Sequence, residues 1–209
     1  MHHVAVIDYG MGNLRSVAKA LEAVAGTHQV IVTADAKTIR DASHIVFPGV
    51  GAIRDCMATL QQTGLDEVVR AAANSKPFLG ICLGMQALMR HSEENGGTKG
   101  LDIIAGEVRF FDKAADQGLK VPHMGWNQVS QSPHPLWQHI DQDSRFYFVH
   151  SYYVDPQQPQ AIAGTSDYSL SFASAVGQDN VFAVQFHPEK SQHTGLQLLK
   201  NFLDWDGQS

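Results

Sequence analysis

Residues 77–90 contain the pattern that most restricts what this chain can fold into, a buried strand that turns at once into a helix. Positions 78–81 form a short apolar run without alternation, which is typical of a strand buried on both faces of a parallel sheet. Good helix formers follow at 85–90. Between the two, Gly80-Ile-Cys-Leu-Gly84 has the glycine-x-nucleophile-x-glycine form of a strand-to-helix elbow, with Cys82 at its tip.

Cys82 is the candidate nucleophile of this elbow. The flanking glycines matter because a sharp turn leaves no room for Cβ atoms beside the reacting group. The cysteine would stand above the edge of the sheet, at the positive end of the following helix, and that end favours the reactive thiolate over the thiol. A lone cysteine is more often an inert core residue, but two glycines at this spacing, between a strand and a helix, reverse that preference.

The amino-acid composition limits the class of protein. A chain of 209 residues fits one domain, residues 1–209, and 44% hydrophobic with 17% charged residues is ordinary for a soluble globular protein. A net charge of -6 argues against a general nucleic-acid or membrane-surface binder. With two cysteines, no signal peptide and no apolar run of about 18 residues, we expect a cytoplasmic protein. The eleven histidines show no metal-binding spacing, so we expect no metal.

The N-terminal half alternates strands with helices. Apolar runs predict strands, and helical patterns follow them, at 4–8, 14–21, 29–32, 35–41, 44–47, 53–62 and 65–74. This alternation predicts an α/β fold, with a doubly wound, mostly parallel sheet flanked by helices as in flavodoxin-like proteins. Sites in such sheets lie outside the carboxyl ends of the strands. The loop Tyr9-Gly-Met-Gly-Asn13 lies at that edge, but Arg15 replaces the third glycine of a dinucleotide-binding loop, so we expect no cofactor. We expect Asn13 or a neighbour to cap the following helix.

The pattern changes after residue 100. Strands are predicted at 106–111, 125–130, 145–150, 162–165, 172–176 and 181–186. Several of the gaps are short for helical crossovers, so several of these strands should be antiparallel. An amphipathic final helix at 194–205 should pack on the sheet. We therefore expect an antiparallel strand extension of the parallel sheet, within the same domain.

His187 and Glu189 are the candidate base and its orienting carboxylate. His187 follows the apolar strand at 181–186, so it should lie at the same sheet edge as Cys82. Pro188 keeps His187 extended, and residues i and i+2 of an extended chain face the same side. Glu189 can then accept a hydrogen bond from one ring nitrogen of His187 and leave the other for Cys82. This is the nucleophile, base and carboxylate arrangement of a catalytic triad.

Gly49-Val-Gly51 is a candidate part of an oxyanion hole. By itself it is as well explained as a flexible turn. Near a nucleophile, its glycines would let a peptide plane rotate and aim an N–H group at a reacting carbonyl oxygen, and the N–H of Leu83 would be the second donor.

The other cysteine and several histidines are weaker candidates. Cys56 is most simply a core residue of an amphipathic helix. His150 closes an aromatic strand, where a hydrogen-bonded structural histidine is at least as good an explanation. Solvated histidine is the default expectation in polar or proline-rich segments, which contain His123, His134, His139 and His193.

Gly-Ile-Cys82-Leu-Gly-Met-Gln86 and Phe-His187-Pro-Glu189 resemble the motifs of the class I (triad) glutamine amidotransferases. Further motifs resemble one branch of that family, the glutaminase subunits of imidazole glycerol phosphate synthases. They are Asp8-Tyr-Gly-Met-Gly-Asn13-Leu, Pro48-Gly-Val-Gly51, Pro122-His-Met-Gly-Trp126-Asn127, Phe148-Val-His-Ser151-Tyr152 and His187-Pro-Glu-Lys190-Ser191. The resemblance extends from about residue 4 to 203 without a large gap.

The resemblance implies roles for individual residues. Cys82 would attack the side-chain amide of L-glutamine, His187 would protonate the departing ammonia, and water would hydrolyse the glutamyl thioester. The residues that hold glutamine would be Gly51, Gln86, Ser151 and Tyr152. Val50 and Leu83 would supply the oxyanion N–H groups, once the Gly49–Val50 peptide has reoriented.

The resemblance also implies a partner. Ammonia would pass to a separate (β/α)₈ cyclase subunit in a heterodimer, which makes imidazole glycerol phosphate and an aminoimidazole carboxamide ribotide in histidine biosynthesis. The face turned toward that partner would carry Asn13, Met124, Trp126, Tyr147 and Lys190. Three alternatives remain open from the residues: a class I glutaminase serving GMP, anthranilate or carbamoyl phosphate synthesis, a cysteine hydrolase or peptidase on the same scaffold, and a catalytically inactive regulatory subunit.

Overall fold

The computed structural model describes residues 3–208, and its larger sheet joins twelve strands in that range. Five neighbouring strands are parallel and lie in the order β2-β1-β3-β4-β14. Their bounds are Gln29–Thr33, His3–Ile7, His44–Gly49, Phe78–Cys82 and Val181–Val184. This is the strand order of doubly wound, flavodoxin-like sheets. The predicted fold class, a mostly parallel sheet flanked by helices, is therefore confirmed.

Helices cover both faces of the parallel strands. Alternate residues of β1 enter different cores, with Val4 and Val6 on one face of the sheet and Ala5 and Ile7 on the other. The first core includes α1 (Leu14–Val24) and α6 (Gln192–Asp204), and the second includes α2 (Ala36–Asp41), α3 (Ile53–Thr63) and α4 (Leu65–Ala73). Each fully buried aliphatic or aromatic side chain contributes about 1.5–3 kcal/mol, so strands apolar on both faces are stable only in this layered arrangement.

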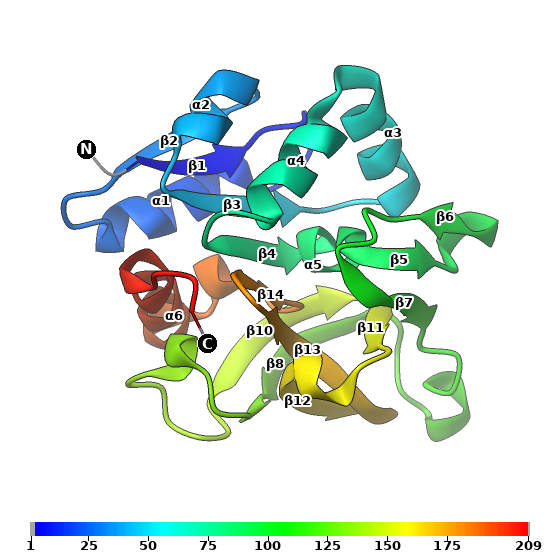
Figure 1. Ribbon diagram of the computed structural model, residues 1–209. Coiled ribbons are helices and arrows are strands. Elements are labelled where there is room, and N and C mark those ends of the chain that lie inside the picture. The colour runs from blue at the N-terminus through cyan, green and yellow to red at the C-terminus, as the bar shows by residue number, and fades with distance from the viewer. Residues whose placement is uncertain (1–2, 209) are drawn as a thin grey trace.

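The extension begins at β14, and most of its strands lie in the lower part of Figure 1, while β5 and β6 lie at the right of the view. From β14 the sheet continues in the order β13-β11-β7-β5-β6, while β12 pairs with β13 and β9 pairs with β12. The bounds are Leu170–Gln178, Tyr152–Pro156, Ile104–Phe110, Met89–Ser92, Thr98–Lys99, Ile162–Tyr168 and Ser130–Gln131. A second sheet pairs β8 (His123–Gln128) with β10 (Arg145–His150). The predicted antiparallel extension is confirmed.

The segment after the elbow differs from the prediction. The helix α5 covers only Leu83–Ala87, and Met89 already begins strand β5. The residues at 85–90 favour a helix, but pairing with a distant strand overrides that preference, because β5 runs parallel to β7 with Met89 opposite Ile104. The strand β11 was not predicted, and the single strand predicted at 125–130 is divided between β8 and β9. Short 3₁₀ turns occupy Glu94–Gly96, Ala115–Gln117, Pro135–Trp137, Pro159–Ala161 and Pro188–Lys190.

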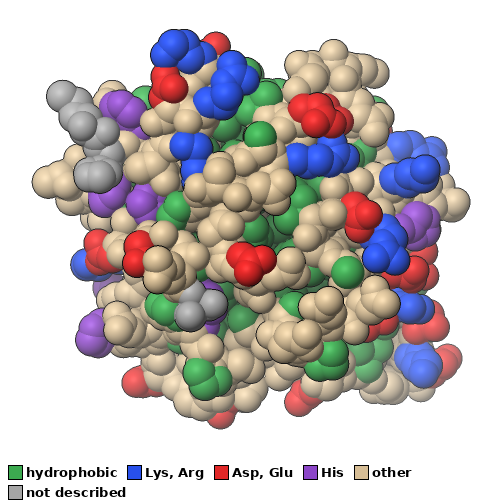
Figure 2. Space-filling view, viewed as in Figure 1, with side chains coloured by type: hydrophobic (Ala, Val, Ile, Leu, Met, Phe, Trp, Pro, Cys, Tyr) green, Lys and Arg blue, Asp and Glu red, His purple; other side chains and the backbone are tan. Residues whose placement is uncertain are grey.

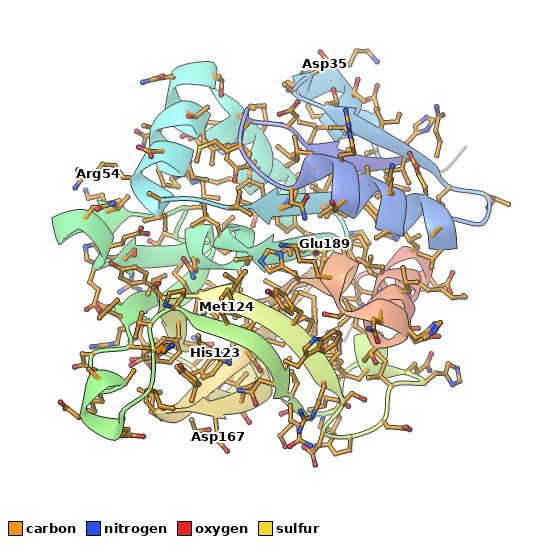
Figure 3. All side chains as sticks on the ribbon, turned by 180° about the vertical axis from the view of Figure 1, so that it is seen from behind. Asp35, Arg54, His123, Met124, Asp167 and Glu189 are labelled. Carbon is orange, nitrogen blue, oxygen red and sulfur yellow. The ribbon has the colours of Figure 1, made fainter. Side chains whose placement is uncertain are left out.

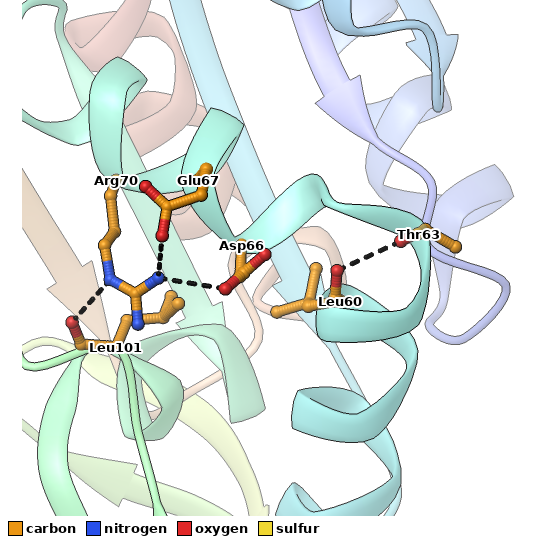
Figure 4. Close-up of polar contacts among 6 residues, drawn as sticks. All are labelled: Leu60, Thr63, Asp66, Glu67, Arg70 and Leu101. Atoms are coloured by element: carbon orange, nitrogen blue, oxygen red, sulfur yellow. Dashed lines mark hydrogen bonds and ion pairs between the residues drawn. The ribbon is translucent and has the colours of Figure 1, made fainter.

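Arg70 on α4 ties the helical layer to the extension of the sheet (Figure 4). Its Nε donates to the carbonyl oxygen of Leu101 at 3.2 Å, and its Nη1 contacts Asp66 at 3.1 Å and Glu67 at 3.2 Å. Partly exposed ion pairs contribute little free energy on their own. The consequence is geometric, because the bond to Leu101 fixes the loop that enters β7 against α4.

Charged side chains of opposite sign lie beside one another on the face seen in Figure 2. On that face the two signs are interspersed. Within residues 3–208, every helix is too short or too polar to cross a bilayer.

Candidate active site

Cys82 ends strand β4 in a strained backbone conformation. Its φ is 54° and its ψ is -110°, a region that residues with a Cβ atom rarely adopt. The elbow glycines are needed for close packing. A Cβ on Gly84 would lie 1.9 Å from the carbonyl oxygen of Phe47, and one on Gly80 would lie 3.0 Å from the Cβ of Ala183. Neighbouring strands on both sides therefore hold the turn that presents Cys82.

His187 reaches the same edge of the sheet because β14 pairs in parallel with β4, with Val184 opposite Ile81. The backbone of His187 is extended, with φ -104° and ψ 97°. Its Nδ1 lies 2.7 Å from Oε1 of Glu189, and these side chains are 2% and 0% exposed. The structure thus brings the carboxylate against one ring nitrogen of His187, as the i, i+2 spacing predicts, and that nitrogen is Nδ1.

The surroundings of His187 favour its charged form. Burial by itself lowers the pKa of His187, but the attraction of Cys82 and the hydrogen bond with Glu189 outweigh it and raise the pKa above its ordinary value. Nε2 of His187 is buried and has no hydrogen-bond partner among the described residues. A charged imidazolium ring beside a cysteine sulfur, with Nε2 free to exchange a proton, is an arrangement suited to acyl transfer.

A cavity of about 340 Å³ opens above Cys82. This is the size of pocket that small metabolites occupy, about 300–1,000 Å³. Nine of the residues named from the sequence line it, namely Val50, Gly51, Cys82, Leu83, Gln86, Ser151, Tyr152, His187 and Lys190. Four further lining residues were not singled out for this site from the sequence, namely Glu94, Pro122, Val149 and His150. Of these, His150 had been considered only as a structural histidine.

The other residues assigned to a partner face do not line the cavity; they are Asn13, Met124, Trp126 and Tyr147. Met124 and Trp126 on β8 are 65% and 42% exposed, unusual values for large apolar side chains. The ring of Tyr147 on β10 lies 6.1 Å from that of Trp126. The Nζ of Lys190 lies 5.8 Å from the centre of the Tyr147 ring. Figure 3 shows Met124 on the β8–β10 sheet and Glu189 near the centre of the molecule. These side chains therefore form a rim beside the cavity.

Asn13 has a different contact from the one expected of a helix cap. It occupies the N-cap position of α1 but makes no capping hydrogen bond with its side chain. Its Nδ2 instead donates to Oε1 of Glu189 at 3.3 Å. The reason is tertiary, because the loop after β1 and the turn after β14 meet at the same sheet edge. Asn13 thus adds a second donor to the oxygen that orients His187.

Gln185 is a polar residue of the site that sequence reasoning missed. It is fully buried, and its Nε2 lies 3.7 Å from Sγ of Cys82. Its Oε1 accepts from Nε2 of Gln86 at 3.1 Å. The signal was present in the sequence, because the alternation that places Glu189 beside His187 also places Gln185 on the same side, two residues earlier.

His123 is not a solvated loop residue as expected. It lies on β8, is 4% exposed, and its Nδ1 is 2.9 Å from Nε2 of His150. Nδ1 of His150 in turn lies 2.7 Å from the carbonyl oxygen of Tyr152, which confirms a hydrogen-bonded structural role. Burial lowers the pKa of His123 to about 4 and that of His150 to about 3, so both rings are neutral at pH 7. His134 is also partly buried, and burial lowers its pKa to about 4.

The second cysteine lies in the core, as expected. Cys56 on α3 is 0% exposed, and burial raises the pKa of its thiol to about 12. Among residues 3–208, no group of three or more histidine, cysteine, aspartate or glutamate side chains is arranged to hold a metal ion.

Comparison with solved structures shows the fold. The crystal structure of a glutamine amidotransferase superposes with a TM-score of 0.74 at 16% identity, covering 96% of this chain and 97% of the other. The PurLQS structure from Thermotoga maritima gives a TM-score of 0.71 at 16% identity, covering 97% and 98%.

Comparison with known sequences shows the family. The family described as glutamine amidotransferase class-I matches residues 5–205. The imidazole glycerol phosphate synthase subunit HisH of Acinetobacter baylyi is 60% identical, covering 99% of this chain and 100% of the relative. That of Nitrosococcus oceani is also 60% identical, covering the whole of both chains. The chain therefore belongs to the class I glutamine amidotransferase family and, within it, to the family of the HisH subunits.

Proposed function

We propose that this protein is the glutaminase subunit of an imidazole glycerol phosphate synthase, which hydrolyses L-glutamine to glutamate and supplies ammonia to a cyclase subunit. The observation that carries the proposal is the arrangement of Cys82 with the buried pair of His187 and Glu189 at one cavity, in a chain 60% identical along its length to HisH subunits. Cys82 is the nucleophile, His187 the general acid and base, and Glu189 the carboxylate that orients the ring.

In the first half of the reaction, Sγ of Cys82 attacks the carbon of the glutamine side-chain amide. The carbonyl electrons move to oxygen, and a tetrahedral intermediate forms. When it collapses, the carbon–nitrogen bond breaks, and Nε2 of His187 gives its proton to the nitrogen, which leaves as ammonia. The raised pKa of His187 suits this step, because the ring begins protonated.

In the second half, water attacks the glutamyl thioester. His187 is now neutral and takes one proton of that water, and the new tetrahedral intermediate breaks its carbon–sulfur bond to release the Cys82 thiolate and the side-chain carboxylic acid. The acid loses its proton to solvent and leaves as glutamate. Glu189 holds Nδ1 of the ring at 2.7 Å throughout, so Nε2 keeps facing the reacting atoms. Atoms and charge balance without a cofactor, so we propose that none takes part.

The oxyanion of each intermediate is stabilised by the backbone N–H groups of Val50 and Leu83. Leu83 follows the nucleophile directly, as in other strand-to-helix elbows, and Val50 lies between two glycines. Gly51 has a φ of 93°, a conformation open mainly to glycine. The plane of the Gly49–Val50 peptide turns about ψ of Gly49, which has no Cβ atom, and φ of Val50, and we propose that its reorientation completes the hole. One such donor contributes about 2.7–4 kcal/mol, or roughly 10²–10³ in rate.

Glutamine binds in the cavity against Gly51, Gln86, Ser151 and Tyr152. All four line the cavity, and Ser151 brings a hydroxyl that can donate or accept. The rim of Asn13, Met124, Trp126, Tyr147 and Lys190 is the face for the (β/α)₈ cyclase. Exposed aromatic and methionine side chains are typical of such interfaces, and Lys190 belongs to both the cavity and the rim.

We also propose that residues 1–209 form one domain and that the protein works in the cytoplasm. Pairing of β14 with β4 joins the end of the chain to its N-terminal half, which supports a single domain. Both cysteines are free thiols, which suits a reducing compartment.

Glutamate release, measured with and without purified cyclase and its ligand, tests the proposal. The isolated chain should be a poor glutaminase, and the complex should be faster by roughly 10²–10³ or more. Full activity of the isolated chain contradicts the reorientation of the Gly49–Val50 peptide. GMP and anthranilate synthesis partners serve as controls and should not activate it.

A Cys82→Ala complex tests the nucleophile separately. It should release no glutamate from glutamine, while added ammonium salt still supports the cyclase reaction. Continued glutamine hydrolysis by this variant would show that Cys82 is not the nucleophile, and loss of the ammonia-dependent reaction would show a wider structural defect.

A further inference from the structure

Gln185 is a buried polar side chain that the triad does not explain. It follows β14 directly, is 0% exposed, and its backbone N–H donates to the carbonyl oxygen of Ser174 at 2.9 Å. A primary amide in an apolar core is costly unless its oxygen and nitrogen both find partners. Here both do, and the partners are Gln86 and the nucleophile Cys82.

The hydrogen-bond chain fixes the direction of the Gln185 amide. The carbonyl oxygen of Tyr152 can only accept, and Gln86 lies 3.2 Å from it, so Gln86 must present its NH₂ group there. The other N–H of that group then donates to Gln185 at 3.1 Å, so Gln185 must present its oxygen to Gln86. Its NH₂ group is left facing Sγ of Cys82 at 3.7 Å.

An NH₂ group that faces sulfur favours the thiolate, because it can donate a hydrogen bond to the anion and cannot accept one from the thiol. The other ionisable groups around Cys82 act differently. His187 faces it from the other end of the same extended segment, and Glu189 lies behind His187. Tyr9 faces it from the loop after β1, and burial raises the pKa of Tyr9, so its hydroxyl stays neutral.

We propose that Gln185 is a positioning residue that holds the sulfur of Cys82 as a thiolate and, through Gln86, joins it to the wall of the substrate cavity. The role of this contact in catalysis rests on the proposed glutaminase function, in which Cys82 is the nucleophile. The segment after β14 then serves the nucleophile twice, with His187 for proton transfer and Gln185 for anchoring. Phe186 between them points the other way, into the core, where its ring stacks on that of Phe146 with the centroids 4.0 Å apart.

The test is the pH dependence of Cys82 alkylation by iodoacetamide in the full-length chain, followed by peptide mass spectrometry. Gln185→Met keeps the volume and removes the donor, and Gln185→Glu places a carboxylate against the sulfur. In both variants the pH of half-maximal alkylation should rise, by about one unit for methionine and further for glutamate, since a hydrogen bond to a charged group shifts an equilibrium about tenfold or more. Ser174→Ala on the paired strand is the matched control and should keep the original profile.

Kinetics of the complex with cyclase give the second readout. Gln185→Met should lower kcat/KM for glutamine about tenfold at neutral pH, and the deficit should shrink at higher pH, where the thiolate forms without help. A Gln185→Met chain that alkylates with the unchanged profile overturns the proposal. NMR of the wild-type protein gives a further test that needs no variant. If the side-chain amide proton signal of Gln185 does not move as Cys82 titrates, the proposal is overturned. Alkylation requires no glutamine, so failure of the glutaminase function would appear separately, as absent glutamate release by the wild-type complex.

Discussion

Replacing Cys82 by glycine removes the Cβ atom that makes its backbone conformation unfavourable. With φ at 54° and ψ at -110°, Cys82 lies in a region that is open mainly to glycine. Residues held in such regions store about 1–3 kcal/mol of strain. The fold maintains the strain because β4 is paired on both sides, with β3 and with β14. Cys82→Gly should release it, whereas Cys82→Ala retains a Cβ atom and should not.

The effect of this strain on the free energy of unfolding can be estimated by comparing alanine with glycine at position 82 and at position 56. At the buried, helical Cys56, the change from alanine to glycine loses one methyl group, about 0.8 kcal/mol, and adds about 0.5–1 kcal/mol of backbone entropy. The same losses apply at Cys82, reduced there by the strain that glycine relieves. The alanine-to-glycine loss of unfolding free energy should therefore be smaller at Cys82 than at Cys56 by about 1–3 kcal/mol.

Urea unfolding of the four single variants, followed by circular dichroism, measures this difference. Both Cys82 variants lack the nucleophile, so only their stability is compared. Equal alanine-to-glycine losses at the two positions would refute the reasoning, because they would mean that the elbow stores no strain at the nucleophile. The slope against urea should be the same in all four, which checks that the unfolded states are comparable.

Three further predictions concern the carboxylate, the elbow and the buried histidines. Glu189→Gln should lower kcat by up to about 10⁴-fold in a steady-state glutaminase assay, the loss expected when a triad carboxylate becomes an amide; near-normal turnover would remove Glu189 from the triad. Gly84→Ala should cost about 1–3 kcal/mol or more in urea unfolding, since its Cβ would meet the carbonyl oxygen of Phe47 at 1.9 Å, whereas Gly177→Ala has room and serves as the control, with nearest atoms at 3.4 Å. Burial lowers the pKa of His123 and of His134 to about 4 and that of His150 to about 3, so the unfolded chain binds these protons first as the pH falls. Stability that is complete above about pH 6.5 should decline between pH 6.5 and 5, by about 2 kcal/mol for each ring; a flat profile in that window contradicts the burial.

Local patterns in the sequence were enough to select Cys82 and His187, the proposed nucleophile and base, which the structure places at one cavity. The elbow around Cys82 is defined by its own glycines and by the apolar run before it. The pairing of His187 with Glu189 follows from two residues of extended chain, and the structure has it at 2.7 Å. The alternation of strands and helices gave the fold class, since strands apolar on both faces need helices on both sides. These signals act over a few residues, so they survive without any knowledge of long-range contacts.

Only the tertiary structure decided the features that depend on pairing between distant segments. Met89 enters a strand because β7 offers it hydrogen bonds, although its neighbours favour a helix. His123 is buried because β8 pairs with β10 and packs its ring against Phe148 and Tyr168. Asn13 reaches Glu189 across 176 positions of the chain. Such contacts depend on the total apolar area that the whole fold buries. That total cannot be deduced from the residues next to each partner in the sequence.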